Sequence, residues 1–453
     1  MIYKFLIQIV KAALFFFFKK IVVTGKEQIP GNGPLIIVAN HPNTFMDPLL
    51  IAAITSQRIG FVANASIFLN QFVSRIFSYF HVIPIFRKKD VAPGEKPDNR
   101  QAFSKCHEYL DQNGTLLIFP EGTSYYELKL RDIKTGTARI ALSFEQWKGY
   151  EGNLKIVPIA LDYSDSIQFR SVVSVTVCRP ISVHAFKLAY EKNEFEAVSE
   201  LTELVRSELG DLIPQTSGKE QEKFLVRAHQ FYTAFYAPKA DLNLNPKQSL
   251  EVRNQVSKAL QFIRKENLDL YLDTETKLLL FFELLKEEGL TTNVISDSIS
   301  PKKGFLVYAI NLLKYILLFP IYVFGLCANY VPYMLTAKIF KSLKLDIEYK
   351  APVQMITGFF TFPLYYALII WLFRMHISTE FWHSLLLFIL MPISGYMTLY
   401  YYAELRRFIK NLHFDFFIKK DKKEVILNLR GEILENMEEA RNYSTVASGS
   451  SEN

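Results

Sequence analysis

His41 and Asp47 are the first residues of the chain whose types and spacing could do chemistry. They follow the apolar run 35–39, which is typical of a buried strand. A carboxylate that accepts a hydrogen bond from one ring nitrogen fixes the imidazole tautomer, so the other nitrogen can act as a base near neutral pH. The pair predicts general-base catalysis, with a capping arrangement at a strand end as the alternative. Because no serine or cysteine nucleophile motif stands beside it, a covalent triad is not favoured.

A second polar group follows the apolar run 115–119 and consists of Glu121, Gly122, Thr123 and Ser124. The glycine allows backbone to approach a ligand closely, and the amides and hydroxyls after it can bind an anion. Lys134 follows ten residues later and could add positive charge. This segment predicts an anion-binding turn, with an ordinary tight turn as the alternative.

Two further residues stand out in apolar runs. Arg87 ends the run 82–86, and a guanidinium at a strand end can hold a phosphate through two hydrogen bonds. A solvated loop is the alternative there. Pro158 lies inside the run 155–160, and a proline cannot donate a ladder hydrogen bond. It therefore predicts an edge strand or a bulge near the site.

The elements that must position these residues alternate between about residues 34 and 179. Strands are expected at 35–39, 59–63, 82–86, 115–119, 155–160 and 172–178, and helices at 48–56, 66–80, 99–112 and 136–146. Strands rich in Val, Ile and Leu that are separated by helices predict an α/β fold with a mostly parallel sheet flanked by helices. Ligands bind outside the carboxyl ends of such strands, where the main motifs fall.

Four segments, taken in this order, resemble the sequence blocks of glycerolipid acyltransferases. They are His41 to Asp47, residues 83–87 (IPIFR), residues 119–124 (FPEGTS) and residues 157–159 (VPI). The resemblance covers roughly residues 25–185. The stretch 158–171 is most similar to fungal-type glycerol-3-phosphate/dihydroxyacetone-phosphate acyltransferases, which also carry membrane segments after the catalytic domain.

The resemblance implies direct acyl transfer without a covalent enzyme intermediate, and without a metal or cofactor. His41 would take the proton from the acceptor hydroxyl, and Asp47 would orient the imidazole. Substrate binding would fall to Arg87, Glu121, Gly122, Thr123, Ser124, Lys134 and Pro158, the last on the acyl-donor side. The family has four residues between the histidine and the aspartate, whereas this chain has five. We expect the extra residue to be absorbed near Pro42.

Composition excludes several classes of protein. The chain has 453 residues, 50% of them hydrophobic and 14% aromatic, which excludes a disordered or fibrous chain. The net charge of +7 is too mild for dedicated nucleic-acid binding and suits an anionic membrane surface or a phosphorylated substrate. The three cysteines form no metal-binding or disulfide pattern.

Hydropathy divides the chain further. Residues 1–24 predict an interfacial amphipathic helix, with a first core helix as the alternative, before the acyltransferase domain 25–185. A helical soluble region 186–300 precedes the membrane region 301–410, and 411–453 forms a cytoplasmic tail whose end is disordered. Within the membrane region we expect a re-entrant or bent double pass at 304–337 and a hairpin of spans at 353–373 and 381–403. This places all three flanking basic clusters, and the catalytic domain, on the cytoplasmic side.

The expected function is transfer of a fatty acyl group from an acyl thioester to a hydroxyl of glycerol-3-phosphate in phospholipid biosynthesis. The donor would be acyl-CoA or an acyl-carrier protein, and the other partners would be membrane lipids rather than nucleic acid. Acylation of lysophosphatidate or another lysophospholipid is the first alternative, and a non-catalytic membrane lipid-binding protein is the second. A transporter is disfavoured because the two clear spans lack embedded carboxylates.

Overall fold

The computed structural model describes residues 2–65, 75, 77–86, 98–239, 244–299 and 304–449. The chain forms two compact units. Unit 1 comprises Met1–Thr216 together with Asp346–Pro352, and unit 2 comprises Ser217–Leu345 together with Val353–Asn453. The predicted helical region 186–300 is therefore shared between the units, because its first part belongs to unit 1.

An eight-stranded sheet runs through the described part of unit 1 in the order β1-β7-β6-β2-β5-β3-β4, with β8 paired to β6. Its strands are β1 (Lys20–Thr24), β2 (Leu35–Ala39), β3 (Ile59–Asn64), β4 (Val82–Ile85), β5 (Thr115–Ile118), β6 (Lys155–Tyr163), β7 (Val172–Val177) and β8 (Ile181–Ser182). The pairs that β6 makes with β7 and β8 are antiparallel, and the other neighbours pair in parallel. The prediction of a mostly parallel α/β sheet is confirmed.

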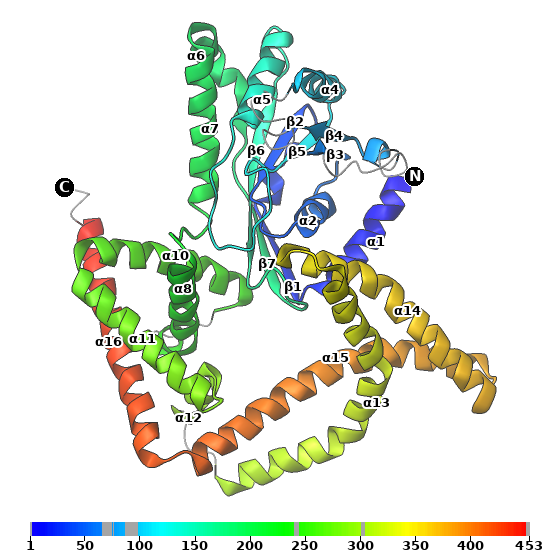
Figure 1. Cartoon of the computed structure of the whole chain (residues 1–453), viewed down its shortest axis with the longest axis vertical. Helices are drawn as coiled ribbons and strands as arrows, with labels where there is room; N and C mark the ends of the chain where they lie inside the picture. Colours follow the sequence, from blue (N-terminus) through cyan, green and yellow to red (C-terminus); the bar gives the residue numbers. More distant parts are fainter. Residues whose placement is uncertain are drawn as a thin grey trace. The chain divides into compact units, whose positions relative to one another are not determined.

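Helices cover both faces of this sheet. One face packs against α4 (Arg100–Asp111), α5 (Gly136–Trp147) and α7 (Glu194–Gly210) in a continuous apolar core, and the short α6 (Lys187–Lys192) precedes α7. Helix α2 (Met46–Ile54) lies on the side opposite α7 (Figure 1). Since side chains alternate along a strand, Ile36 and Val38 of β2 both point into this core, which lies on the face covered by α4, α5 and α7. The predicted helix at 66–80 falls mostly outside the described residues.

The amino-terminal segment differs from its prediction. Helix α1 spans Ile2–Phe17, but Lys20–Thr24 is a strand that pairs in parallel with β7. The run Ile21-Val22-Val23-Thr24 is β-branched throughout, which favours a strand. Leu14, Phe17 and Phe18 are buried, whereas Phe5 and Phe15 are exposed. One side of α1 therefore packs into unit 1, and the other side exposes apolar residues that suit contact with a membrane surface.

The predicted edge position of Pro158 is wrong, because β6 is an inner strand between β2 and β7. Pro158 stands opposite Val38 of β2. On its other side β8 pairs with β6 only up to Ile156, and β7 pairs only from Ile159 onward. The proline thus sits in the gap between two partners, where a missing N–H breaks no ladder bond.

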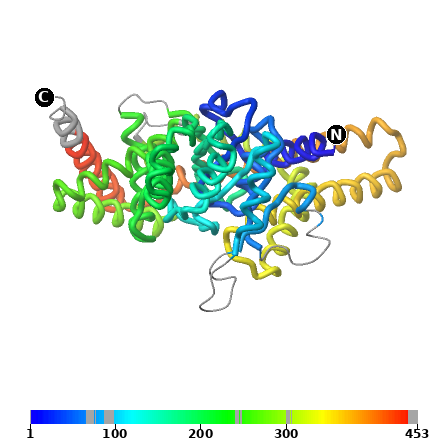
Figure 2. Tube along the Cα trace, turned by 90° about the horizontal axis from the view of Figure 1, so that it is seen from above, coloured from blue at the N-terminus to red at the C-terminus, as the bar shows by residue number. Residues whose placement is uncertain are grey.

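Unit 2 contains a helical cluster and three long apolar helices. The cluster comprises α8 (Lys219–Phe231), α10 (Pro246–Glu266), α11 (Leu268–Glu287), α12 (Thr292–Ile299) and α16 (Lys420–Gly449), together with the π-helix Tyr232–Tyr236 that precedes the short α9 (Ala237–Lys239). Helix α16, red in Figure 2, packs along α11, which is green. Residues from before and after the apolar helices therefore share one core.

The apolar helices are α13 (Phe305–Leu343), α14 (Lys350–His376) and α15 (Phe381–Leu412). All three are long and apolar enough to cross a membrane. The predicted hairpin at 353–373 and 381–403 corresponds to α14 and α15. The segment 304–337, for which we expect a re-entrant or bent double pass, lies in one continuous helix of 39 residues that contains Pro320 and Pro332. Prolines are tolerated inside such helices when neighbouring groups satisfy the freed backbone.

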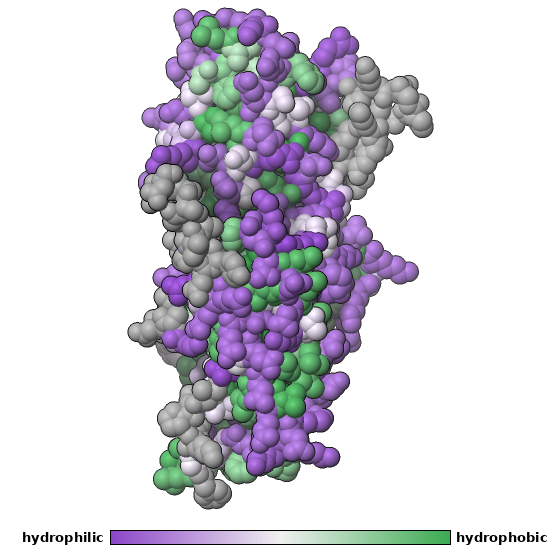
Figure 3. Space-filling view, turned by 90° about the vertical axis from the view of Figure 1, so that its left-hand side faces the viewer, coloured by the Kyte–Doolittle hydropathy of each residue, from purple (hydrophilic) through white to green (hydrophobic). Residues whose placement is uncertain are grey.

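The surface of the three apolar helices differs in polarity from the face of the protein drawn in Figure 3. On the face drawn in Figure 3, hydrophilic side chains dominate and hydrophobic ones form smaller patches. By contrast, many large apolar side chains of α13, α14 and α15 are exposed, among them Leu306, Leu364 and Trp382, each about 70% accessible. Exposed apolar surface on this scale fits a lipid environment rather than water.

Candidate active site

The centre of the site is a direct hydrogen bond between His41 and Asp47. His41 lies in the turn between β2 and α2, and its Nδ1 is 2.8 Å from Oδ2 of Asp47. Asp47 is fully buried, whereas the imidazole keeps 17% of its surface accessible. The five-residue spacing is accommodated by a tight turn, since Asn43 O accepts from both Met46 N and Asp47 N. A water-mediated link is not needed.

Asp47 is held by two further donors. Asn43 N donates to Oδ2 at 2.7 Å, and the hydroxyl of Tyr163 on β6 donates to Oδ1 at 2.5 Å. Burial, followed by the nearby Asp47 charge, raises the pKa of Tyr163 well above its usual value, so its hydroxyl stays protonated. With its oxygens engaged in this way, Asp47 accepts the Nδ1 proton of His41. That tautomer leaves the lone pair on Nε2.

The imidazole plane is also fixed by stacking. The ring of His41 lies 3.9 Å from the ring of Phe119, centroid to centroid, with an angle of 14° between the planes. Phe119 follows β5, so the strand next to β2 supplies this support. Hydrogen bonding at one edge and stacking on one face leave the ring little freedom, which is what a positioned base requires.

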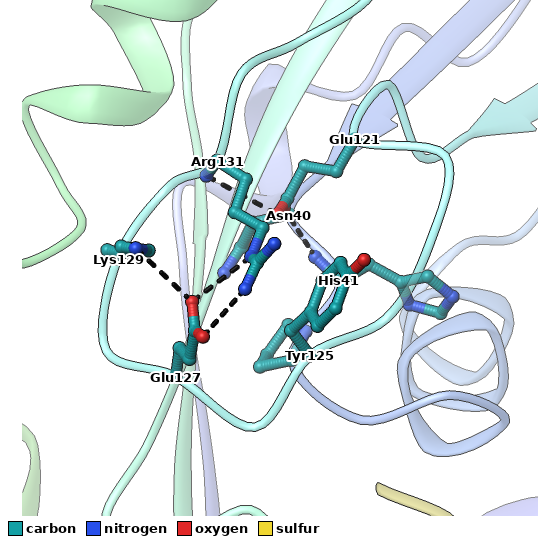
Figure 4. Close-up of a pocket in the computed structure, with 8 residues that line it drawn as sticks. Asn40, His41, Glu121, Tyr125, Glu127, Lys129 and Arg131 are labelled. Carbon is teal, nitrogen blue, oxygen red and sulfur yellow. Dashed lines mark hydrogen bonds and ion pairs between the residues drawn. The ribbon is translucent and has the colours of Figure 1, made fainter. Parts of the chain in front are cut away.

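Glu121 joins the loops that follow β2 and β5. Its Oε1 accepts from His41 N at 2.9 Å, and its Oε2 accepts from Arg131 N at 3.4 Å. Figure 4 shows the carboxylate between these two amides. Burial raises the pKa of Glu121, and the two backbone hydrogen bonds oppose that shift. Two more bonds join the same loops, from Thr44 N to Ser124 Oγ at 2.9 Å and from Tyr125 N to His41 O at 3.2 Å.

A small pocket beside His41 carries a cationic group. It is lined by Asn40, His41, Pro42, Glu121, Tyr125, Glu127, Lys129 and Arg131. Arg131 makes two bonds to Glu127, of 2.6 and 3.1 Å, and Lys129 lies 3.5 Å from the same carboxylate. The guanidinium stacks over Tyr125 at 3.3 Å from the ring centroid (Figure 4). Two cations thus share the Glu127 carboxylate near the imidazole.

The other predicted residues are placed as follows. Gly122 has φ of 74°, and a Cβ there would collide with Lys134 Nζ, so the amine of Lys134 lies against the turn. Thr123 Oγ1 donates to Gly122 O at 2.7 Å. Pro158 is buried in the sheet beside β2 and does not line the pocket. Arg87 lies outside the described residues.

Sequence analysis missed several residues of the site. Tyr163 is 116 positions from Asp47, and nothing local marks it, because only the alignment of β6 beside β2 brings the two together. Lys129 and Arg131 could have been identified from their position in the sequence. They lie, like Lys134, in the loop between β5 and α5, so their charges could have been assigned to the site with equal reason.

Part of the chain is similar in sequence to known proteins. Residues 20–162 match the family model described as Acyltransferase. The chain is 27% identical over 174 residues to glycerol-3-phosphate O-acyltransferase 1 of Saccharomyces cerevisiae, covering 38% of this chain and 22% of that protein. It is 26% identical over 145 residues to the chloroplastic 1-acyl-sn-glycerol-3-phosphate acyltransferase LPAT1 of Arabidopsis thaliana, covering 32% and 36% respectively.

A solved structure is also similar. The 1-acyl-sn-glycerophosphate acyltransferase PlsC of Thermotoga maritima shares 21% identity with a TM-score of 0.33, over 45% of this chain and 80% of that one. The matches span at most 36% of these two curated relatives. The matched segment, 20–162, contains all four motifs and the His41–Asp47 pair. Residues 20–162 of this chain are therefore similar to the Acyltransferase family.

Proposed function

We propose that the protein is a membrane-bound O-acyltransferase that moves a fatty acyl group from an acyl thioester to a hydroxyl of glycerol-3-phosphate. The observation that carries this proposal is the oriented His41 imidazole, bonded directly to Asp47 and adjoining a pocket with two cations. The name of the yeast relative supports glycerol-3-phosphate as the acceptor. The product would be a lysophosphatidate, an early precursor in phospholipid biosynthesis.

The reaction needs one base and an activated acyl donor. Nε2 of His41 accepts the proton of the acceptor hydroxyl as its oxygen bonds to the thioester carbonyl carbon. The C–S bond then breaks, and the departing thiolate takes the proton from the imidazolium, which restores His41. Asp47 stabilises the imidazolium in between. General-base catalysis contributes about 10²–10⁴-fold, and holding the acceptor beside the thioester supplies much of the rest.

Binding the phosphate of the acceptor requires cationic side chains near His41. Lys129 and Arg131 line the pocket that contains the imidazole, and Lys134 lies against the turn at Gly122. We assign acceptor binding to these residues together with Arg87, Glu121, Thr123 and Ser124. Pro158 is assigned to the donor side.

Lysophosphatidate is the second candidate acceptor. The chloroplastic relative is named for a 1-acylglycerol-3-phosphate acceptor, and both acceptors present a phosphate and a hydroxyl. A purely lipid-binding role has less support, because a binder has no use for an imidazole fixed by Asp47 and Phe119.

The donor would be acyl-CoA or an acyl-carrier protein, and since the thioester is already activated, the reaction needs no metal or cofactor. We place the catalytic domain on the cytoplasmic face. Basic residues at both ends of the α14–α15 hairpin support this orientation, by the preference of cytoplasmic segments for Lys and Arg. They are Lys338, Lys341, Lys344 and Lys350 before it, and Arg406, Arg407 and Lys410 after it.

The test is acyl transfer by the purified full-length protein in lipid nanodiscs. Labelled acyl-CoA and acyl-carrier-protein donors are offered with glycerol-3-phosphate, dihydroxyacetone phosphate or lysophosphatidate. The highest kcat/KM is expected for glycerol-3-phosphate. A clear preference for lysophosphatidate would establish the second candidate, and no transfer to any of the three acceptors would refute the proposed activity.

A further inference from the structure

Seven residues from the second half of the chain belong to unit 1. They are Asp346–Pro352, which comprise the end of the α13–α14 connection, with its short 3-10 helix Ile347–Tyr349, and the first three residues of α14. Ala351 is fully buried, and Pro352 is buried as well. This connection is therefore packed as part of the unit that holds the active site.

Glu348 makes the polar contacts of the connection with the loops of the site. Its carboxylate Oε1 accepts from the backbone N–H of Tyr126 at 3.1 Å. Its backbone carbonyl accepts from the hydroxyl of Thr44 at 3.1 Å. Next to it, the ring of Tyr349 lies 6.1 Å from the ring of Phe45, centroid to centroid.

These partners lie on the two loops that carry the catalytic groups. Thr44 is three residues after His41, and its N–H is already bonded to Ser124. Tyr126 follows Tyr125, whose N–H donates to His41 O. Glu348 therefore bridges the loop after β2 and the loop after β5 from a third segment, 222 residues beyond Tyr126.

We propose that Glu348 is a positioning residue for acyl transfer, acting through Thr44 and Tyr126 on the loop that holds the His41 imidazole. The inference rests on the proposed function and adds the α13–α14 connection to the active site. Glu348 bonds to both loops at once, through its side chain to Tyr126 N and through its backbone carbonyl to Thr44, so its contacts tie the two loops together. Small displacements of a catalytic base cost rate more than they cost binding.

The first test compares Glu348→Ala with Glu348→Gln. Glutamine keeps an Oε1 acceptor for Tyr126 N, whereas alanine removes it. Glu348→Ala is expected to lower kcat about tenfold with the acceptor KM within about twofold, and Glu348→Gln to restore most of kcat. Asp346→Ala is the matched control, since Asp346 is an exposed acid of the same connection that caps no helix through its side chain. Its kcat should equal that of the wild type.

The second test removes the other contact. Thr44→Val loses the hydroxyl that donates to Glu348 O, and Thr44→Ser keeps it, so only the valine variant should lose kcat. If Glu348→Ala does not yield folded protein by size exclusion and thermal unfolding, this pair decides the question by itself. Wild-type kcat in both Glu348→Ala and Thr44→Val, or a lower melting temperature without a loss of kcat, would overturn the positioning role. Absence of acyl transfer by the wild type would instead refute the proposed function.

Discussion

At the scale of single residues, Asp47 is the best-determined group of the site. It is fully buried and accepts hydrogen bonds from His41, Asn43 and Tyr163. A buried carboxylate with this many donors is fixed in direction, and it fixes the imidazole in turn. The His41–Asp47 pair could be predicted from sequence because both residues lie in one short turn. Tyr163 could not, because it comes from another strand.

Asp47→Asn tests the orientation of the imidazole. An amide can present its NH₂ to Nδ1 and so favour the tautomer with the proton on Nε2, which cannot act as the base. We expect kcat to fall by about 10²–10⁴-fold with the protein still folded, checked by acyl transfer and thermal unfolding. Retention of more than half of the wild-type kcat would contradict this role.

Tyr163→Phe tests the support of Asp47 itself. Loss of the hydroxyl leaves Oδ1 of a buried carboxylate without its donor, and we expect kcat to fall about tenfold. Tyr150→Phe is the control, because the Tyr150 hydroxyl is buried but has no hydrogen-bond partner among the described residues. Equal activities of the two variants would show that Tyr163 matters only for packing.

At the scale of elements, the site is built where β2 and β5 end side by side. Their parallel pairing brings the turn at His41 and the turn at Glu121 together, and sequence predicted this because both runs are short, apolar and followed by polar residues. Sequence misplaced Pro158, since a proline signals a missing hydrogen bond but not where the gap in the sheet lies. It also missed β1, whose β-branched run directly follows an apolar helix.

Glu121, which joins the two turns, should make stability depend on pH. Its pKa in the folded protein is raised above the usual 4.5, so folding favours the protonated carboxyl. The stability that it contributes is present at low pH and is lost as pH rises through the raised pKa. The melting temperature of wild type minus that of Glu121→Gln is therefore expected to fall as the pH rises above 4.5. A difference that stays constant or grows over this range would contradict the raised pKa.

At the scale of the whole molecule, the packed units restrict how the chain crosses a membrane. Helices α8, α10, α11, α12 and α16 share one apolar core, so they must lie on one side of any membrane that the chain crosses. Unit 1 joins α8 through residues 211–218, which contain no candidate span, and it includes Asp346–Pro352 at the far end of α13. We therefore expect both ends of α13 to lie on the same side of the membrane, with α14 and α15 crossing it as a hairpin.

Single-cysteine labelling tests this arrangement. In a background that lacks Cys106, Cys178 and Cys327, cysteines introduced at Gly304 and at Ser342 should be modified from the same side of sealed vesicles. A cysteine at Ser378, between α14 and α15, should be modified from the opposite side. Labelling of positions 304 and 342 from opposite sides would show that α13 crosses.

The most direct test of the account is the rate of acyl transfer by His41→Ala. His41→Ala removes the proposed base, and we predict that kcat falls by about 10²–10⁴-fold with thermal unfolding unchanged. His184→Ala, which removes an exposed imidazole elsewhere in the same unit, should keep the wild-type rate. Turnover by folded His41→Ala at the rate of the His184→Ala control would contradict the mechanism.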